Sequence, residues 1–352
     1  ALFGLIAQTL PMETLNLVID DTLILRQSKS APGSAIRYDH AKKPNRSEFV
    51  QAQCWVSLGI SVLGSAGRKH VLPIVSRLVP ATGHRNKLMI ALALVRGLAP
   101  VMKGKSVRVL FDAWFMRARL VLPLLARKMC VIGQARHDTA LFLPPVVLVK
   151  SGRGRPKKYG AKITPAAIHA LPVTELKLTL YGKERQVRLR SIVAMARFLK
   201  GVLIRAVWCE FFDVDKQSWS KARLLLATET DLNPEEILRL YAHRWGIEPL
   251  FHNLKRWWGA NNLWQQKRTV LELWMQIRSI AWTMVQLLSL VIENHFPINA
   301  VAPWRSKQPL TAGLVAQWLR MEFTGLPFRD GHHRKSSIFT FPKQRGDPRL
   351  RD

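Results

Sequence analysis

Isolated carboxylates stand at three places in a strongly basic sequence. "VIDDT" carries Asp20 and Asp21, "VLFDAWF" carries Asp112, and "YAHRWGIEPLFHNLKRWWG" has Glu248 as its one acid. Hard oxygen ligands suit Mg²⁺, which proteins commonly hold with few carboxylates, water and substrate phosphate. Two such ions about 3.5–4 Å apart can assist both the attacking and the leaving oxygen of a phosphodiester displacement. These residue types therefore suit metal-dependent chemistry on a phosphate backbone.

The charge of the whole chain points to the same class of partner. Lys and Arg number 54 against 23 Asp and Glu, which gives a formal net charge of +31. Such an excess favours a polyanionic partner. Hydrophobic residues make up 48% and charged residues 22% of the chain, which is typical of a globular protein and not of a disordered basic tail. At 352 residues, two or three domains, or one large domain with an insertion, are expected.

The cysteines and the apolar runs restrict the compartment. Cys54, Cys130 and Cys209 lie far apart and form no CxxC pair, so a reducing compartment, the cytoplasm, is predicted. The uncharged run "SIAWTMVQLLSLVI" has 14 residues, short of the roughly 20 that span a bilayer. It is interpreted as a buried helix, and no membrane partner is expected. No signal peptide is recognised, and the first residue, Ala1, leaves open a missing upstream segment.

Two similar apolar runs are predicted to deliver the aspartates. "LNLVIDDTLIL" (15–25) and "SVRVLFDAWF" (106–115) each indicate a buried strand with acids towards its end. Further strands are predicted at 49–62, 70–80 and 128–138, with helices at 84–105 and about 117–127. This order predicts a mixed α/β sheet with acids at strand ends.

The rest of the chain divides by composition. Short strand-like pieces between about 139 and 232 predict a β-rich insertion, and the chain becomes irregular and basic from about 297. Between them, 233–258 is predicted to be one helix with Asn233 as its N-cap. The expected domains are a first core part at 1–138, the insertion at 139–232, a second core part at 233–296 and a basic C-terminal region at 297–352.

One stripe of this helix collects polar residues. At about 100° of rotation per residue, Tyr241, Arg244, Glu248 and Lys255 fall together, beside the apolar face. An ordinary i,i+4 ion pair between Arg244 and Glu248 is the alternative to a role in chemistry. Pro249 predicts a kink directly after the glutamate, and a helix that ended there would leave the position of Lys255 open.

The same four residues carry a family resemblance. They stand at Y-x2-R-x3-E-x6-K, which resembles the signature of the IS4-like group of DDE transposases, to which the Tn5 transposase also belongs. "VIDDT" and "VLFDAWF" resemble the first and second aspartate motifs of that group, in the right order. The resemblance covers roughly residues 15–260.

The resemblance implies a catalytic site. A ribonuclease H-like fold would bring Asp21, Asp112 and Glu248 together as catalytic residues and ligands of two Mg²⁺ ions, with Mn²⁺ as a substitute. The activity implied is cut-and-paste cleavage and strand transfer at transposon ends. Asp20 stays an alternative to Asp21, because adjacent strand residues point to opposite faces; the resemblance favours Asp21, directly before Thr22. Asp112 has a second interpretation as the cap of the following helix.

The resemblance also implies DNA contacts. Tyr241, Arg244 and Lys255 are expected to grip the transposon end, and Trp219 is a candidate platform for an exposed base. "GRGRPKKYG" (152–160) resembles an AT-hook. Its inserted side chains would be Arg153 and Arg155, and a basic loop without base preference is the alternative interpretation. The partners implied are transposon ends and target DNA, with a homodimer on paired ends in the nucleoid.

Two functional hypotheses remain open. The first is an active transposase core, favoured by the three acids. The second is a catalytically unproductive or truncated DNA-binding protein derived from a transposase, favoured by the short stretch of about 20 residues before the first motif.

Overall fold

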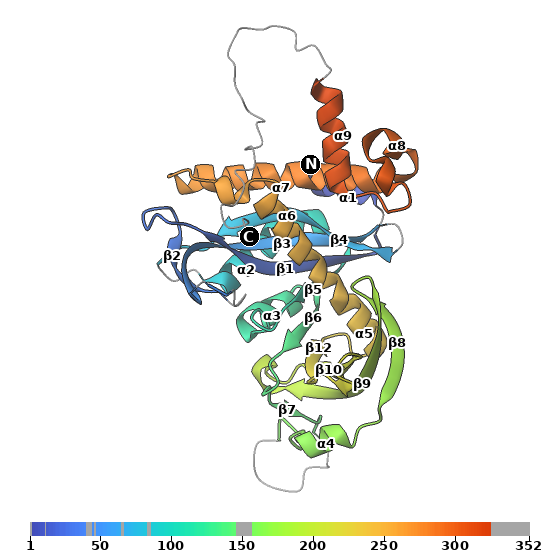
Figure 1. Cartoon of the computed structure of the whole chain (residues 1–352). Coiled ribbons are helices and arrows are strands. Elements are labelled where there is room, and N and C mark those ends of the chain that lie inside the picture. The colour runs from blue at the N-terminus through green and yellow to red at the C-terminus, as the bar shows by residue number, and fades with distance from the viewer. Residues whose placement is uncertain are drawn as a thin grey trace.

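A twelve-stranded sheet runs through the part of the chain that the structure describes (Figure 1). The structure is a computed structural model and describes residues 2–324, except 11, 40–43, 46, 65–66, 83–85 and 146–156. The strands are β1 (Thr14–Leu25), β2 (Ser34–Tyr38), β3 (Phe49–Leu63), β4 (Lys69–Leu78), β5 (Ser106–Phe111), β6 (Cys130–Ala135), β7 (Leu141–Phe142), β8 (Thr174–Leu180), β9 (Lys183–Ala196), β10 (Leu203–Asp213), β11 (Ser218–Trp219) and β12 (Arg223–Ala227).

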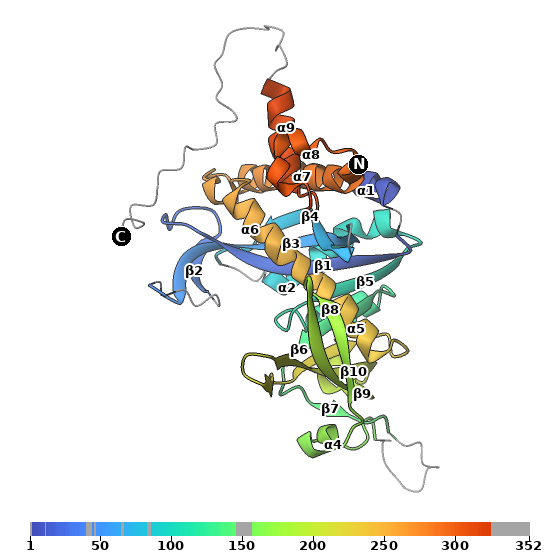
Figure 2. The same cartoon turned by 45° about the vertical axis from the view of Figure 1, so that its right-hand side comes forward.

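Helices cover both faces of this sheet (Figures 1 and 2). The α-helices are α1 (Leu2–Thr9), α2 (Lys87–Leu98), α3 (Ala118–Leu125), α4 (Pro165–His169), α5 (Pro234–Tyr241), α6 (Ile247–Arg256), α7 (Arg268–Val291), α8 (Ile298–Val301) and α9 (Ala312–Thr324). Short 3₁₀ helices are η2 (Ala99–Met102), η3 (Arg197–Leu199), η4 (Ala242–Gly246), η5 (Ala260–Asn262), η6 (Glu293–His295) and η7 (Pro303–Arg305).

The strand directions are mixed. β4, β3 and β1 pair antiparallel, whereas β1, β5 and β6 pair in parallel. Val18 of β1 lies opposite Leu110 of β5, so the acidic ends of the two runs reach the same region of the sheet. The mixed α/β class predicted from the sequence is confirmed, and it is consistent with a ribonuclease H-like fold.

The β-rich segment continues this sheet. β12 pairs with β6, β10 pairs with β12, and β9 pairs with β10. β8 and β9 form a hairpin whose turn is Tyr181–Gly182, and both turn residues have a positive φ, of 57° and 75°. That combination is typical of a type I′ turn. The hairpin lies over α5 in both views, and its apolar residues pack in the same core as α5.

The alternation of β1 separates two cores. Leu17 and Ile19 point into the core under α2 and α3, while Val18 points into the core under α5, α6 and α7. Successive strand residues face opposite sides of a sheet, so Asp20 and Asp21 must also point to opposite sides. Which helix layer an acid meets is therefore fixed by its place in this alternation.

The predicted helix at 233–258 is interrupted. α5 ends at Tyr241, η4 tightens the chain over Ala242–Gly246, and α6 starts at Ile247. The 3₁₀ stretch lies shortly before Pro249 and includes Trp245, whose carbonyl loses the i→i−4 hydrogen bond that a proline cannot donate. The expected kink stays a prediction, whereas the alternative that the helix ends at Glu248 is wrong. Pro249 is the third residue of α6, within the first turn, where a backbone N–H has no partner inside the helix. The helix after Glu248 persists to Arg256, so Lys255 is held in its last turn.

A buried histidine fixes η4 to the sheet. Nδ1 of His243 lies 2.8 Å from Oγ of Ser61 in β3. Burial is the main reason that the pKa of His243 is lowered to about 4, and Lys69 and Arg108 add to the effect. The break in the helix is thus held by a tertiary contact.

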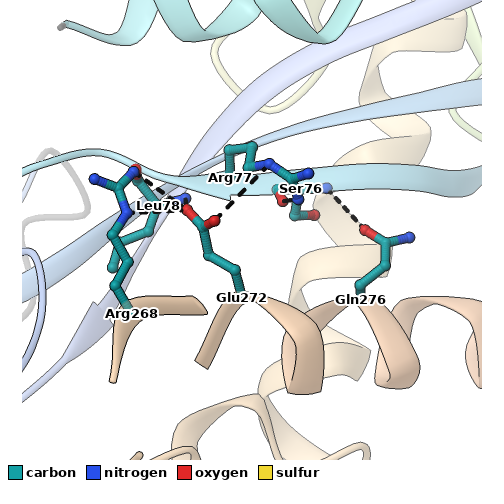
Figure 3. A network of polar contacts seen from close by, with 6 residues as sticks. All are labelled: Ser76, Arg77, Leu78, Arg268, Glu272 and Gln276. Carbon is teal, nitrogen blue, oxygen red and sulfur yellow. Dashed lines mark hydrogen bonds and ion pairs between the residues drawn. The ribbon is translucent and has the colours of Figure 1, made fainter. Parts of the chain in front are cut away.

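α7 covers the free edge of β4 (Figure 3). Gln276 accepts from the backbone N–H of Ser76 at 3.3 Å and donates to the carbonyl of Ile74 at 2.6 Å. Glu272 accepts from the backbone N–H of Leu78, at 3.1 Å. Exposed strand edges invite pairing with other chains. Side chains of α7 therefore satisfy backbone groups that an additional strand would otherwise bind.

Residues 298–324 are more regular than their composition suggested. Beyond residue 297, where an irregular chain was expected, α8 and α9 pack on the end of α7 through Phe296, Val301, Leu314 and Val315. Among the described residues, no helix has the length and apolar character needed to cross a bilayer.

We expect the Gln276→Leu substitution to destabilise the fold by about 1–3 kcal/mol, because it leaves two backbone groups of β4 without partners. Urea unfolding measures the change. Gln186→Leu, at an exposed position of β9, serves as the matched control and should have a much smaller effect. Equal effects of the two substitutions would show that the edge contact contributes little.

We expect acid to weaken the fold through His243. The folded pKa of about 4 lies below the ordinary value of 6.5, so the unfolded chain binds a proton that the folded chain does not. The free energy of unfolding should fall by up to ~3 kcal/mol as the pH drops through this window. Denaturation curves of His243→Asn should show a shallower acid limb, whereas exposed His252→Asn keeps the wild-type profile. An unchanged limb in His243→Asn contradicts the assignment.

Candidate active site

Asp20 lies on the α6 side of β1. It pairs with Ser57 of β3 and shares its face with Val18, which packs under α5 and α6. Its Oδ2 accepts a hydrogen bond from Nη1 of Arg244 at 3.0 Å, and only 15% of each side chain is exposed. The first acidic motif therefore meets the broken helix through Asp20.

Asp21 is held on the other side of the strand. Its Oδ2 accepts from Nζ of Lys87, in the first turn of α2, at 2.7 Å. The thiol of Cys54 donates to the same oxygen at 3.3 Å. Lys87 also lies over the ring of Trp114, 4.6 Å from its centroid. A partly buried ion pair with Lys87 thus balances the charge of Asp21, away from Arg244.

Asp112 follows directly after β5. Its Oδ1 accepts from the backbone N–H groups of Trp114 at 3.0 Å and Phe115 at 3.3 Å, before α3 begins. These bonds fix the carboxylate as the head of a tight turn. The capping interpretation considered for Asp112 therefore accounts for Oδ1 only. Oδ2 takes no part in these two hydrogen bonds.

Arg244 joins two of the acids. Nη1 binds Asp20, and Nη2 binds Oε1 of Glu248 at 2.7 Å. The predicted i,i+4 pair between Arg244 and Glu248 is therefore present, but it is half of a larger bridge. Glu248 is 49% exposed and stands in the first turn of α6, where the helix dipole favours an acid.

The charges of the cluster alter one another. Burial is the largest cause that raises the pKa of Asp20 to about 7, Asp112 raises it further, and Arg244 acts in the opposite direction. Burial also raises the pKa of Asp112, against the two backbone N–H groups, and Asp21 adds to the rise. Burial disfavours the charge of Arg244, yet Tyr241, Asp20 and Glu248 raise its pKa overall. The carboxylates of Asp20 and Glu248 therefore stabilise the positive charge of the Arg244 guanidinium.

The donor set fits a divalent cation, although the ligands are not gathered into a shell. Among the described residues, no group of three or more His, Cys, Asp or Glu side chains is close enough to hold a metal. The guanidinium of Arg244 lies between Asp20 and Glu248. A position between two acids is one that a metal cation would also favour. Carboxylate oxygens are the ligands that Mg²⁺ and Mn²⁺ prefer.

The remaining residues of the predicted stripe lie along the same side. Tyr241 is buried, and its hydroxyl donates to Oε1 of Gln134 in β6 at 3.4 Å. Lys255 lies further along β1, in a narrow hollow that Thr22 and Ser57 also line. The stripe residues are therefore spread along the sheet, from Gln134 of β6 beside Tyr241 to the Thr22 part of β1 beside Lys255.

Sequence reasoning missed the contribution of the β8–β9 hairpin. Its turn brings Tyr181 to Trp245, with ring centroids 5.7 Å apart in an edge-on contact. Burial raises the pKa of Tyr181, and both Arg244 and Glu248 are near enough to alter it. The positive φ of Tyr181 belongs to the type I′ turn that places its side chain at this end of the hairpin. The Tyr-Gly pair between two strand-like runs was the available signal.

The predicted DNA-contact residues outside the stripe lie elsewhere. Trp219 is in β11, where Arg188 stacks on its ring at 4.2 Å and Phe212 meets it edge-on. One face of its ring is therefore already covered. Arg153 and Arg155 fall outside the described residues, so the AT-hook interpretation stays a prediction.

Comparison with known proteins places this arrangement in a family. A search of curated proteins found no match to the chain. A family model described as "Transposase DDE domain" matches residues 15–284, which hold both aspartate motifs, the β-rich segment and the broken helix. Members of such a family act on DNA and generally use divalent metal ions. The chain belongs to the family of transposases with a DDE domain.

Proposed function

We propose that this chain is an IS4-like transposase that cuts DNA at transposon ends and joins the freed 3′ ends to target DNA. The observation that carries the proposal is the bridge at Arg244. Acids that are 228 positions apart in the chain, Asp20 and Glu248, bind one guanidinium beside Asp112. The Y-x2-R-x3-E-x6-K spacing supports the finer assignment to the IS4-like group.

Asp20, Asp112 and Glu248 are the proposed metal ligands. Asp20 replaces Asp21, which the sequence favoured, because Asp21 is paired with Lys87 on the opposite side of β1. Two Mg²⁺ ions, or Mn²⁺ in their place, would activate the attacking oxygen and stabilise the leaving oxygen of the displacement. The chain itself would hold the three acids next to one another, and Arg244 would occupy the place of a cation until DNA binds.

Arg244 has two proposed roles. Without metal it neutralises Asp20 and Glu248, and with DNA its guanidinium binds a backbone phosphate in a bidentate manner. Tyr241 and Lys255 are proposed to contact the same DNA end. Trp219 is proposed as a base platform through the ring face that Arg188 does not cover, and Arg153 and Arg155 as minor-groove contacts.

The assembly is proposed to be a homodimer on paired ends, within the nucleoid of the cytoplasm. The second hypothesis, an unproductive DNA-binding protein derived from a transposase, has one observation in its favour. Arg244 keeps two of the three acids paired, and the described residues hold no gathered metal shell. A nicking assay separates the two hypotheses.

We expect the full chain with Mg²⁺ to nick supercoiled plasmid, and Asp20→Asn and Glu248→Gln each to slow nicking by ~100-fold or more. A metal site supplies several kcal/mol of transition-state stabilisation, and each 1.36 kcal/mol is tenfold in rate. Asp21→Asn is the matched control, because it is the same substitution one residue away, and it should retain most activity. The opposite order of effects would return the assignment to Asp21. No nicking by the unsubstituted chain would favour the unproductive protein.

We expect Arg244→Gln to raise the affinity for Mn²⁺ in the absence of DNA, because it removes the cation that competes for Asp20 and Glu248. Electron paramagnetic resonance of free Mn²⁺ measures this binding directly. Arg239→Gln is the control, since Arg239 pairs with Glu235 on the outer side of α5. Unchanged or weaker Mn²⁺ binding by Arg244→Gln would contradict the proposed competition.

A further inference from the structure

The outward side of α7 is apolar along its length. Residues there recur at alternating steps of four and three, the spacing of a coiled-coil seam. They are Val270, Trp274, Ile277, Ala281, Met284, Leu288 and Val291. Exposed fractions reach 44% at Ile277 and 53% at Met284, and neighbouring Leu273 is 58% exposed. We call the stretch of this seam from Val270 to Met284 the α7 stripe.

The α7 stripe is not part of the protein's core. The buried apolar residues of α7 point the other way, into the two cores of the sheet, and they are Leu271, Met275, Trp282 and Leu287. Leu288 is packed by the core of α8 and α9, which cover only the C-terminal end of the helix. Figures 1 and 2 show α9 rising from that end, with no other described helix or strand on the outward side of the rest.

The α7 stripe carries no charge. The helix holds three charged residues, and all three are engaged elsewhere. Arg268 and Glu272 bind each other and the backbone of Leu78 in β4. Arg278 donates to the carbonyl of Trp258 at 2.6 Å. A charge-free surface on a chain of net charge +31 does not suit DNA, whose binding depends on phosphate contacts. It suits another apolar protein surface.

We propose that the α7 stripe binds the α7 stripe of a second copy of this chain, as an antiparallel helix pair centred on Ile277. This rests on the proposed function, in which two copies act on paired DNA ends. A heptad seam is complementary to itself, and a two-fold axis brings the same patch of both copies together. Ile277 is the middle residue of the stripe, so the axis passes beside it.

The size of the stripe makes this pairing conditional on DNA. At about 1.5 Å per residue the stripe is ~21 Å long, and with a helix diameter of ~10 Å it offers roughly 200 Å² per copy. Stable interfaces bury about 800 Å² per partner. Two chains of net charge +31 also repel each other. DNA bound by both copies removes the repulsion and supplies the effective concentration that a weak contact needs.

Cysteine crosslinking tests the geometry. Ile277→Cys should form disulfide-linked dimers on a mixed-sequence duplex long enough for two copies, at least ~10-fold more than without DNA, since tethering raises effective concentration. The native Cys54 and Cys209 are buried, and the unsubstituted chain reports any background from Cys130. Val214→Cys, at an exposed apolar position of the insertion, is the matched control. Crosslinking at Ile277 no greater than at Val214 overturns the proposal, including the case in which this chain's own C-terminal residues cover the stripe.

Charge insertion tests the same contact without new chemistry. Ile277→Glu and Met284→Glu should reduce sedimentation of two-copy complexes on the duplex, while Val214→Glu does not. Undiminished two-copy complexes in both stripe variants overturn the proposal. Mn²⁺ binding separates this failure from failure of the proposed function: the site lies within each copy, so stripe variants should bind Mn²⁺ as the unsubstituted chain does. Absence of Mn²⁺ binding by the unsubstituted chain with duplex DNA bound, where Arg244 is proposed to have moved onto a phosphate, would count against the metal site alone.

Discussion

The contact of one guanidinium with two carboxylates organises the candidate site. Arg244 binds Asp20 of the sheet and Glu248 one turn further along its own helix, because the helical backbone that continues from η4 into α6 places the two side chains on one face. Burying charges is costly unless they are paired. Arg244 therefore serves as the cation that pairs with Asp20 and Glu248. A metal ion at these acids, or a DNA phosphate at Arg244, can bind only if that pairing changes.

The rest of the fold places side chains with different partners on different faces of its strands and helices. Alternation along β1 sends Asp20 to the broken helix and Asp21 to Lys87, so two adjacent acids have separate partners. α7 makes a similar division: its polar side chains close the edge of β4, and its outward face is apolar and uncharged. On a chain with an excess of Lys and Arg, the uncharged α7 stripe is the surface that we propose for protein contact.

The sequence was sufficient where burial sets the pattern. Apolar runs at 15–25 and 106–115 predicted β1 and β5. Asp112 follows β5 as expected, but Asp20 and Asp21 lie within β1 and not at its end, because β1 stays paired with β3 as far as Leu25. It was insufficient where a tertiary contact decides. The 3₁₀ stretch at Ala242–Gly246 carries the contact of His243 with Ser61, and no helical propensity reveals that contact. The choice between Asp20 and Asp21 depends on which helix covers which face, and Tyr181 reaches the site only because a hairpin folds back over α5.

The central claim is that Asp20, Asp112 and Glu248 form a metal site that Arg244 occupies in the absence of metal. Anomalous scattering from crystals soaked in Mn²⁺, with a duplex DNA bound, tests it most directly. The account predicts an anomalous peak bounded by these three carboxylates, with the Arg244 guanidinium moved onto a phosphate. A peak at Asp21 beside Lys87, or an Arg244 bridge that stays intact under bound metal, would contradict it.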